Sequence, residues 1–180
     1  LELAKRSLLF HAVDPRLGGL LLMGHRGCAK STLARAFREI LPDSIYSEMS
    51  PFVEVPLGTS EDRLLGSIDA SSLLENGKWS AQRGLIEQAN GGVLYIDEVN
   101  LLPDHLVDSI LDSAASGQHR IERDGLSQTV NARYILIGSM NPEEGDLRPQ
   151  LTDRFMHGIL IHDDFSVEER RGIVRGRMDF

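Results

Sequence analysis

The sequence predicts an α/β domain, a three-layer sandwich in which helices cover both faces of a mostly parallel sheet. Short aliphatic runs alternate along the chain with segments of helical periodicity, and runs this apolar are typical of strands buried on both faces. A glycine-containing loop joins the first run to a helix. The 180 residues fit one domain. With 41% hydrophobic and only 6% aromatic residues, its core must be mostly aliphatic.

Each element follows from a local pattern. Strands are expected at the short apolar runs, which are residues 20–23, 52–55, 93–96, 134–138 and 159–161. Helices are expected where apolar residues recur at helical spacing or a capping residue opens a segment, at 1–13, 31–41, 60–65, 84–90, 104–116, 148–155 and 167–178. Residues 119–122 and 128–133 flank Asp124-Gly125, which predicts a β-hairpin. The segment 68–80, with Gly77 and Trp79, predicts a loop.

The charge and the cysteine content exclude several classes of protein. A net charge of -8 argues against a general affinity for nucleic acid. The single cysteine excludes an internal disulfide and a cysteine-based zinc site, and it fits a reducing compartment. No apolar run approaches the roughly 20 residues that a membrane-spanning helix needs.

The loop after the first strand has the spacing of a phosphate-binding loop. In such a loop, backbone N–H groups surround phosphate oxygens and the helix N-terminus adds partial positive charge. Lys30 would contact the β- and γ-phosphates, and the Ser31 hydroxyl would bind Mg²⁺. The alternative, an ordinary turn with a chance Lys-Ser pair, agrees less well with the glycines and flanking elements. We therefore predict an ATP-binding segment made of Gly24, His25, Arg26, Gly27, Cys28, Ala29, Lys30, Ser31 and Thr32.

Two residues of this loop carry further expectations. Ala29 precedes the lysine, where glycine is usual. Because alanine does not readily adopt a positive φ, we expect Gly27 to supply the left-handed conformation. Cys28 lies near a helix N-terminus, which predicts modest thiol reactivity that bound nucleotide would suppress.

Two acidic residues follow the apolar run at 93–96. Ligands of open α/β sheets bind at the carboxyl edge, where such residues lie. We expect Asp97 to hold Mg²⁺ through water, and Glu98 to orient and polarise the attacking water. Alternation along the strand would send the two side chains to opposite faces and separate these roles. Taken alone, the pair fits a solvated acidic turn better, and it is the upstream phosphate loop that favours a metal site.

Polar residues also follow the run at 134–138. The amide of Asn141 could hydrogen-bond the γ-phosphate or its water, but an Asn-Pro turn with Pro142 explains it equally well. Arg148 or Arg154 could act as an arginine finger on a neighbouring subunit's nucleotide. A surface salt bridge is the alternative for either arginine, and Asp153 is the adjacent candidate partner of Arg154.

Longer strings resemble the AAA+ core of the I-type ATPase subunit of magnesium chelatase, and the similarity spans nearly the whole chain. The most particular is Asn-Pro-Glu-Glu-Gly-Asp-Leu-Arg-Pro-Gln-Leu-Thr-Asp-Arg-Phe at 141–155. The resemblance implies a P-loop nucleoside triphosphatase (AAA+) core over residues 1–180, with the helical lid outside the chain and a β-hairpin insert before the first sensor. The other strings are residues 12–19, 56–63, 94–102, 104–108 and 111–117.

The resemblance also implies a mechanism. Such subunits form hexameric rings with ATP and Mg²⁺ between subunits, and hydrolysis drives insertion of magnesium into protoporphyrin by a larger porphyrin-binding subunit, together with a D-type subunit. By motif, Asn141 matches the first sensor and Arg154 the arginine finger, so these and Glu98 are the expected catalytic residues. Ser31 and Asp97 are the expected metal ligands.

Two alternatives share this core. One is a MoxR-like AAA+ chaperone that remodels a metal-dependent partner, and the other is a D-type platform subunit that hydrolyses ATP weakly. The run at 41–52 is shorter than in the I-type subunit and closer to the D-type. Neither nucleic acid nor a membrane is an expected partner. The expected location is the cytoplasm, or the plastid stroma for a photosynthetic eukaryote.

Overall fold

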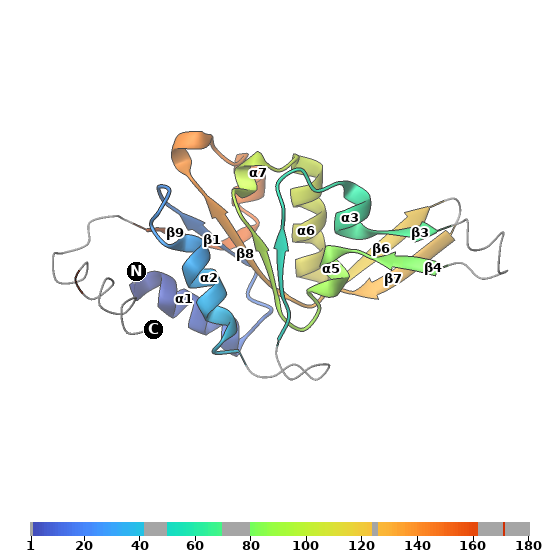
Figure 1. Ribbon diagram of the computed structural model, residues 1–180, viewed down its shortest axis with the longest axis horizontal. Coiled ribbons are helices and arrows are strands. Elements are labelled where there is room, and N and C mark those ends of the chain that lie inside the picture. Colours follow the sequence, from blue (N-terminus) through green and yellow to red (C-terminus); the bar gives the residue numbers. More distant parts are fainter. Residues whose placement is uncertain (1, 42–49, 70–79, 124–125, 162–170, 172–180) are drawn as a thin grey trace.

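The computed structural model describes residues 2–41, 50–69, 80–123, 126–161 and 171 (Figure 1). Its centre is a five-stranded sheet in the order β2-β5-β8-β1-β9, and every neighbouring pair is parallel. This confirms the predicted parallel sheet. The strands are β1 (Gly19–Met23), β2 (Phe52–Val55), β5 (Val93–Ile96), β8 (Ile135–Met140) and β9 (Phe155–Leu160).

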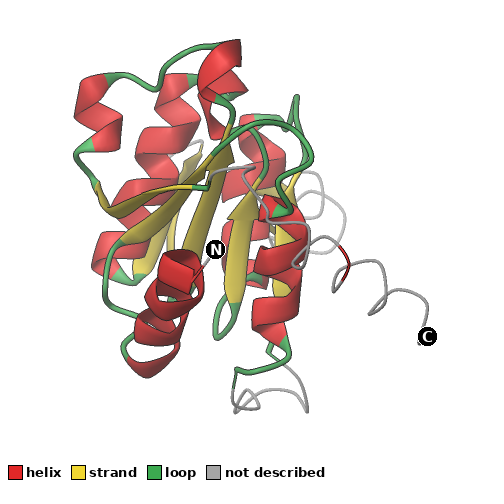
Figure 2. Ribbon diagram, turned by 90° about the vertical axis from the view of Figure 1, so that its left-hand side faces the viewer, coloured by secondary structure: helices red, strands yellow, loops and turns green. Residues whose placement is uncertain are grey.

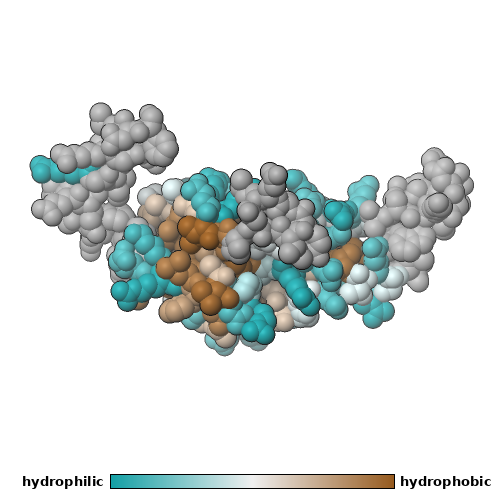
Figure 3. All heavy atoms as spheres, turned by 90° about the horizontal axis from the view of Figure 1, so that it is seen from below, coloured by the Kyte–Doolittle hydropathy of each residue, from teal (hydrophilic) through white to brown (hydrophobic). Residues whose placement is uncertain are grey.

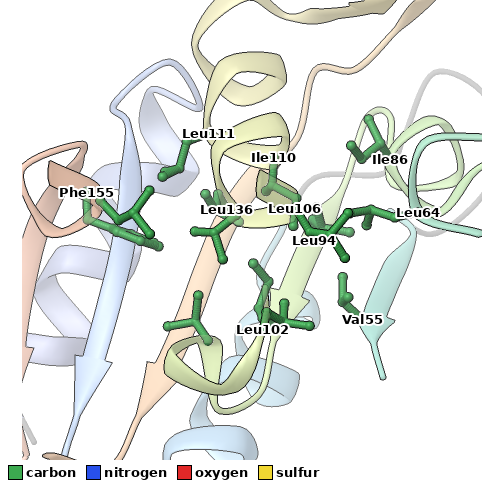
Figure 4. Packing of buried hydrophobic residues seen from close by; sticks show 14 of the residues in the cluster. Val55, Leu64, Ile86, Leu94, Leu102, Leu106, Ile110, Leu111, Leu136 and Phe155 are labelled. Carbon is green, nitrogen blue, oxygen red and sulfur yellow. The ribbon is translucent and has the colours of Figure 1, made fainter. Parts of the chain in front are cut away.

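Helices cover both faces of the sheet, as the three-layer prediction requires (Figure 2). Alternate residues of β1, β2, β5 and β8 enter two separate apolar cores. Leu94 and Leu136 face the larger core with Ile110 of a covering helix (Figure 4), whereas Tyr95 and Ile137 face the other. The larger core is covered by α3 (Glu61–Leu65), α5 (Leu85–Gln88), α6 (Asp104–Ser116) and α7 (Pro149–Thr152), and the other by α1 (Glu2–Val13) and α2 (Lys30–Arg38).

Two antiparallel hairpins project beyond the β2 edge of the sheet (Figure 1). The pairing of β6 (Gln118–Arg123) with β7 (Leu126–Asn131) confirms the predicted hairpin. The loop expected at 68–80 is wrong at its ends, because β3 (Gly66–Asp69) pairs with β4 (Ser80–Arg83). These strands lack an alternating apolar pattern, so the sequence gives no strand signal there. Gly77 and Trp79 lie outside the described residues.

Several predicted boundaries need correction. Strand β9 begins at Phe155, four residues before the expected start, because His157 and Gly158 interrupt the apolar run. Helix α2 ends at Arg38 rather than at residue 41, and β8 continues to Met140. Of the helix expected at 167–178, all but residue 171 lies outside the described residues.

Helix α1 is apolar on its outer side as well as on its buried side. Its exposed large apolar residues are Leu3, Leu9, Phe10 and Val13. Figure 3 shows apolar side chains gathered on the lower face of the molecule, where α1 lies in Figure 1. Within the described part of the chain, no helix is both long enough and apolar enough to cross a membrane.

Candidate functional site

A cavity of about 340 Å³ opens at the carboxyl edge of the sheet. This volume falls in the range of small-molecule sites. The loops after β1, β5 and β8 meet there because the carboxyl ends of parallel strands share one edge. Of the predicted phosphate-loop residues, Gly24, His25 and Cys28 do not line the cavity. The lining residues are Arg26, Gly27, Ala29, Lys30, Ser31, Thr32, Asp97, Glu98 and Asn141.

The loop after β1 takes a left-handed conformation at two positions. Gly27 has φ 84°, as expected, but Ala29 also has a positive φ of 65°, with ψ 23°. The expectation that Gly27 alone would serve is therefore wrong. The left-handed conformation costs an alanine about 1–2 kcal/mol, which the surrounding loop must offset. Gly24 is needed for close packing, since a Cβ there would lie 2.6 Å from the Ile161 carbonyl oxygen.

Helix α2 presents uncapped N–H groups and a lysine at the cavity. The helix begins at Lys30, and Ala29 has no side chain that could cap it, so the first N–H groups are available to an anion. The Lys30 ammonium donates to the carbonyl oxygens of Gly24 (2.5 Å) and His25 (2.8 Å). The lysine therefore lies across the loop. Cys28 is only 2% exposed, which corrects the expected thiol reactivity, because a reagent reaches a buried thiol poorly.

The two acidic residues lie side by side at the cavity. Strand β5 ends at Ile96, so Asp97 and Glu98 belong to the following turn, and Glu98 has a positive φ of 52°. The expectation that strand alternation separates their side chains is wrong, since both line the same cavity. A left-handed non-glycine residue at such a place is typical of functional sites.

A buried hydroxyl holds both acidic residues, and the sequence reasoning missed it. Ser139 is fully buried in β8; its Oγ donates to Asp97 Oδ1 (2.5 Å) and accepts from the Glu98 N–H (3.2 Å). The Tyr95 hydroxyl donates to the same Asp97 oxygen (2.9 Å), and burial raises the pKa of Tyr95, which keeps it a donor. The available signal was a single hydroxyl inside an apolar strand, two residues before Asn141.

Asn141 lies at the cavity, as predicted, and it also forms the Asn-Pro turn that was the alternative explanation. Its side chain is 4% exposed and lines the cavity. Its Oδ1 accepts from the N–H of Glu143 (3.2 Å), which caps the short helix η2 (Pro142–Glu144). The predicted Asn-Pro turn and the predicted cavity position therefore coexist.

Polar and charged contacts join the phosphate loop to Glu98 and to the turn at Pro142–Glu144. Arg26 Nη2 lies 2.6 Å from Glu144 Oε1 and 3.5 Å from Glu98 Oε1. His25 Nδ1 lies 3.3 Å from Glu143 Oε2. Neither Glu143 nor Glu144 lines the cavity. Their contacts with the phosphate loop were not expected, because the sequence does not show which loop the two side chains face.

Both candidate finger arginines lie away from the cavity and pair with α6. Arg148 Nε is 2.5 Å from Asp104 Oδ2. Arg154, just after α7, donates to Asp108 and Asp112 rather than to the adjacent Asp153. Within this chain, both arginines therefore form the salt bridges that were the alternative to a finger role. Across the described ranges, no three His, Cys, Asp or Glu side chains converge on a metal site.

Comparisons with known proteins agree with this geometry. The family model for the AAA domain of the dynein-related subfamily matches residues 19–155. The magnesium-chelatase 38 kDa subunit of Chlorobaculum parvum is 45% identical over 216 residues, covering 99% of this chain and 62% of that protein. An uncharacterized protein of Mycobacterium tuberculosis is 47% identical over 174 residues, covering 97% of this chain and 28% of that protein.

A solved structure shows the same fold. In the complex of magnesium-chelatase subunits BchI and BchD, obtained by single-particle cryo-EM, a chain superposes with a TM-score of 0.82 at 42% identity, covering 98% of this chain and 63% of that one. The chain thus spans between a quarter and two thirds of the length of these relatives. Its nucleotide-site geometry, the family model and the chelatase homology agree: the chain belongs to the AAA ATPase domains, in the dynein-related subfamily.

Proposed function

We propose that this chain is the nucleotide-binding core of the ATP-hydrolysing subunit of a magnesium chelatase. Hydrolysis would drive insertion of magnesium into protoporphyrin by a porphyrin-binding partner, in a hexameric ring that also engages a D-type subunit. The observation that carries the proposal is the convergence of Lys30, Ser31, Asp97 and Glu98 on one cavity. We further propose that residues 1–180 form the core alone, with the lid outside it, and that the protein works in the cytoplasm or plastid stroma.

The residues of the cavity fit a nucleoside triphosphate with Mg²⁺. The N–H groups of α2 and the Lys30 ammonium are donors for phosphate oxygens. The Ser31 hydroxyl and the Asp97 carboxylate are the oxygen ligands that Mg²⁺ prefers. Ser139 and Tyr95 hold one Asp97 oxygen, which leaves the other for the ion or its water. When bound, Mg²⁺ supplies positive charge that stabilises the transferring phosphoryl group.

The remaining roles follow from position and charge. The Glu98 carboxylate faces the cavity, 21% exposed, and accepts a proton from the attacking water. Asn141 orients that water or the γ-phosphate. Arg154 lies outside its own subunit's cavity, which supports action on the nucleotide of a neighbour.

The test is Mg-ATP hydrolysis by the full-length protein, alone and with a D-type and a porphyrin-binding chelatase subunit, while metal insertion is followed by absorbance. Hydrolysis coupled to formation of magnesium porphyrin is the expected result. Hydrolysis without insertion would favour the MoxR-like chaperone. Lys30→Ala is the matched control and should abolish both signals.

A D-type platform subunit is the second candidate, because this chain lacks segments that the 38 kDa chelatase subunit has. The match to the C. parvum chelatase subunit spans 216 positions, more than the 180 residues of this chain, so that relative contains segments absent here. The presence of both Lys30 and Glu98 argues against the platform role. Absence of hydrolysis by the assembled full-length protein would support it.

A further inference from the structure

We propose that Asp108 and Asp112 of α6 are positioning residues that hold the Arg154 guanidinium for action on a neighbouring subunit's nucleotide. We call these two residues the acidic pair. The inference rests on the proposed function, in which Arg154 is the arginine finger. It adds a role for two residues of α6 that do not line the cavity.

The geometry is that of a two-point clamp. Arg154 Nη1 donates to Asp108 Oδ1 at 2.7 Å, and Nη2 donates to Asp112 Oδ1. The two aspartates are four residues apart and therefore lie on the same face of the helix. Because each terminal nitrogen has its own carboxylate, the plane of the guanidinium is fixed as well as its distance from α6.

The two aspartates lie on a helix that is packed firmly against the core. Helix α6 buries Leu106, Val107, Ile110 and Leu111 against the sheet. The backbone positions of Asp108 and Asp112 are therefore fixed by the packing of α6 against the core. The arginine would otherwise be a long side chain following the four-residue helix α7, with many accessible rotamers.

The clamped arginine can still bind an anion. Its side chain is 34% exposed, and a guanidinium has more N–H donors than these two bonds use. The aspartates are 51% and 74% exposed, and ion pairs this exposed contribute little to stability. Orientation of a group that must meet a phosphate at a subunit edge explains the arrangement better than stabilisation does.

The test is mixed-ring complementation with full-length protein. The double variant Asp108→Asn/Asp112→Asn keeps the side-chain volumes and removes the charges. Its ATP turnover should fall by about tenfold or more, since a shift of about 1 Å in a catalytic group can cost ~100-fold. Its KM for ATP should stay unchanged, because its own cavity is intact. Mixing it with Glu98→Gln subunits, which carry an intact clamp, should restore turnover.

Two further mixtures separate this inference from the proposed function. Arg154→Ala mixed with Glu98→Gln should also regain turnover; no rescue there would refute the finger in trans and with it this inference. If that rescue occurs, two results would overturn the role of the acidic pair while leaving the finger in trans intact. One is undiminished turnover of the double variant, and the other is a loss that Glu98→Gln subunits fail to rescue. Asp104→Asn is the matched control, since it removes a similar ion pair of α6 to Arg148 and should leave turnover unchanged.

Discussion

Replacement of Ala29 by glycine should stabilise the protein, although glycine at most positions does the reverse. Ala29 has φ 65° and ψ 23°, a left-handed conformation that costs an alanine about 1–2 kcal/mol and a glycine almost nothing. The glycine in turn adds about 0.4–1 kcal/mol of entropy to the unfolded chain. The difference predicts that Ala29→Gly raises the free energy of unfolding by about 0.5–1 kcal/mol.

The assay is urea unfolding followed by far-UV circular dichroism. With an m-value of about 2 kcal/mol/M, the midpoint should rise by about 0.3–0.5 M. Ala36→Gly is the matched control, because Ala36 is exposed in the last turn of the same helix, where glycine lowers stability by up to about 1 kcal/mol. Equal destabilisation by both substitutions would refute the left-handed conformation of Ala29.

Three other predictions address buried groups. Ser139→Ala removes the donor to Asp97, so it should cost about 1–2 kcal/mol of stability and weaken Mg-nucleotide binding, as titration of a fluorescent nucleotide would show; unchanged affinity would count against the anchor. His11 is fully buried, and burial lowers its pKa, so the folded protein binds fewer protons than the unfolded chain below about pH 6.5. Stability should therefore fall as the pH drops from 7.5 to 5.5, and less so in His11→Gln; equal losses in the two proteins would contradict this assignment. Cys28, 2% exposed, should react with iodoacetamide far more slowly in the folded protein than in urea, and equal rates would show that the thiol is accessible.

The sequence was sufficient for the sheet and for most of the cavity, because both depend on short local patterns. Apolar runs marked the five strands of the sheet, and the Lys-Ser pair lay at the start of the next helix as its spacing required. Asp97 and Glu98 were placed at the correct edge. The relative orientation of their side chains was not predicted, because strand alternation ends at Ile96 and the turn that follows has its own conformation.

What the sequence could not provide are contacts between distant segments. Ser139 holds Asp97 from a neighbouring strand, and the two are joined only by the sheet register. The partners of Arg154 lie more than 40 residues earlier on α6, whereas the sequence offered only its neighbour Asp153. The positive φ of Ala29 is a property of the closed loop, and intrinsic preference alone predicted the opposite.

Glu98 is proposed to act on water at a nucleotide bound by the loop around Lys30. The most direct test compares Mg-ATP binding and single-turnover hydrolysis by full-length wild-type protein and Glu98→Gln in assembled rings. We predict that the variant binds ATP as tightly as wild type and does not turn it over, because the amide keeps the shape of the site and removes the base. Loss of binding, or turnover at the wild-type rate, would contradict it.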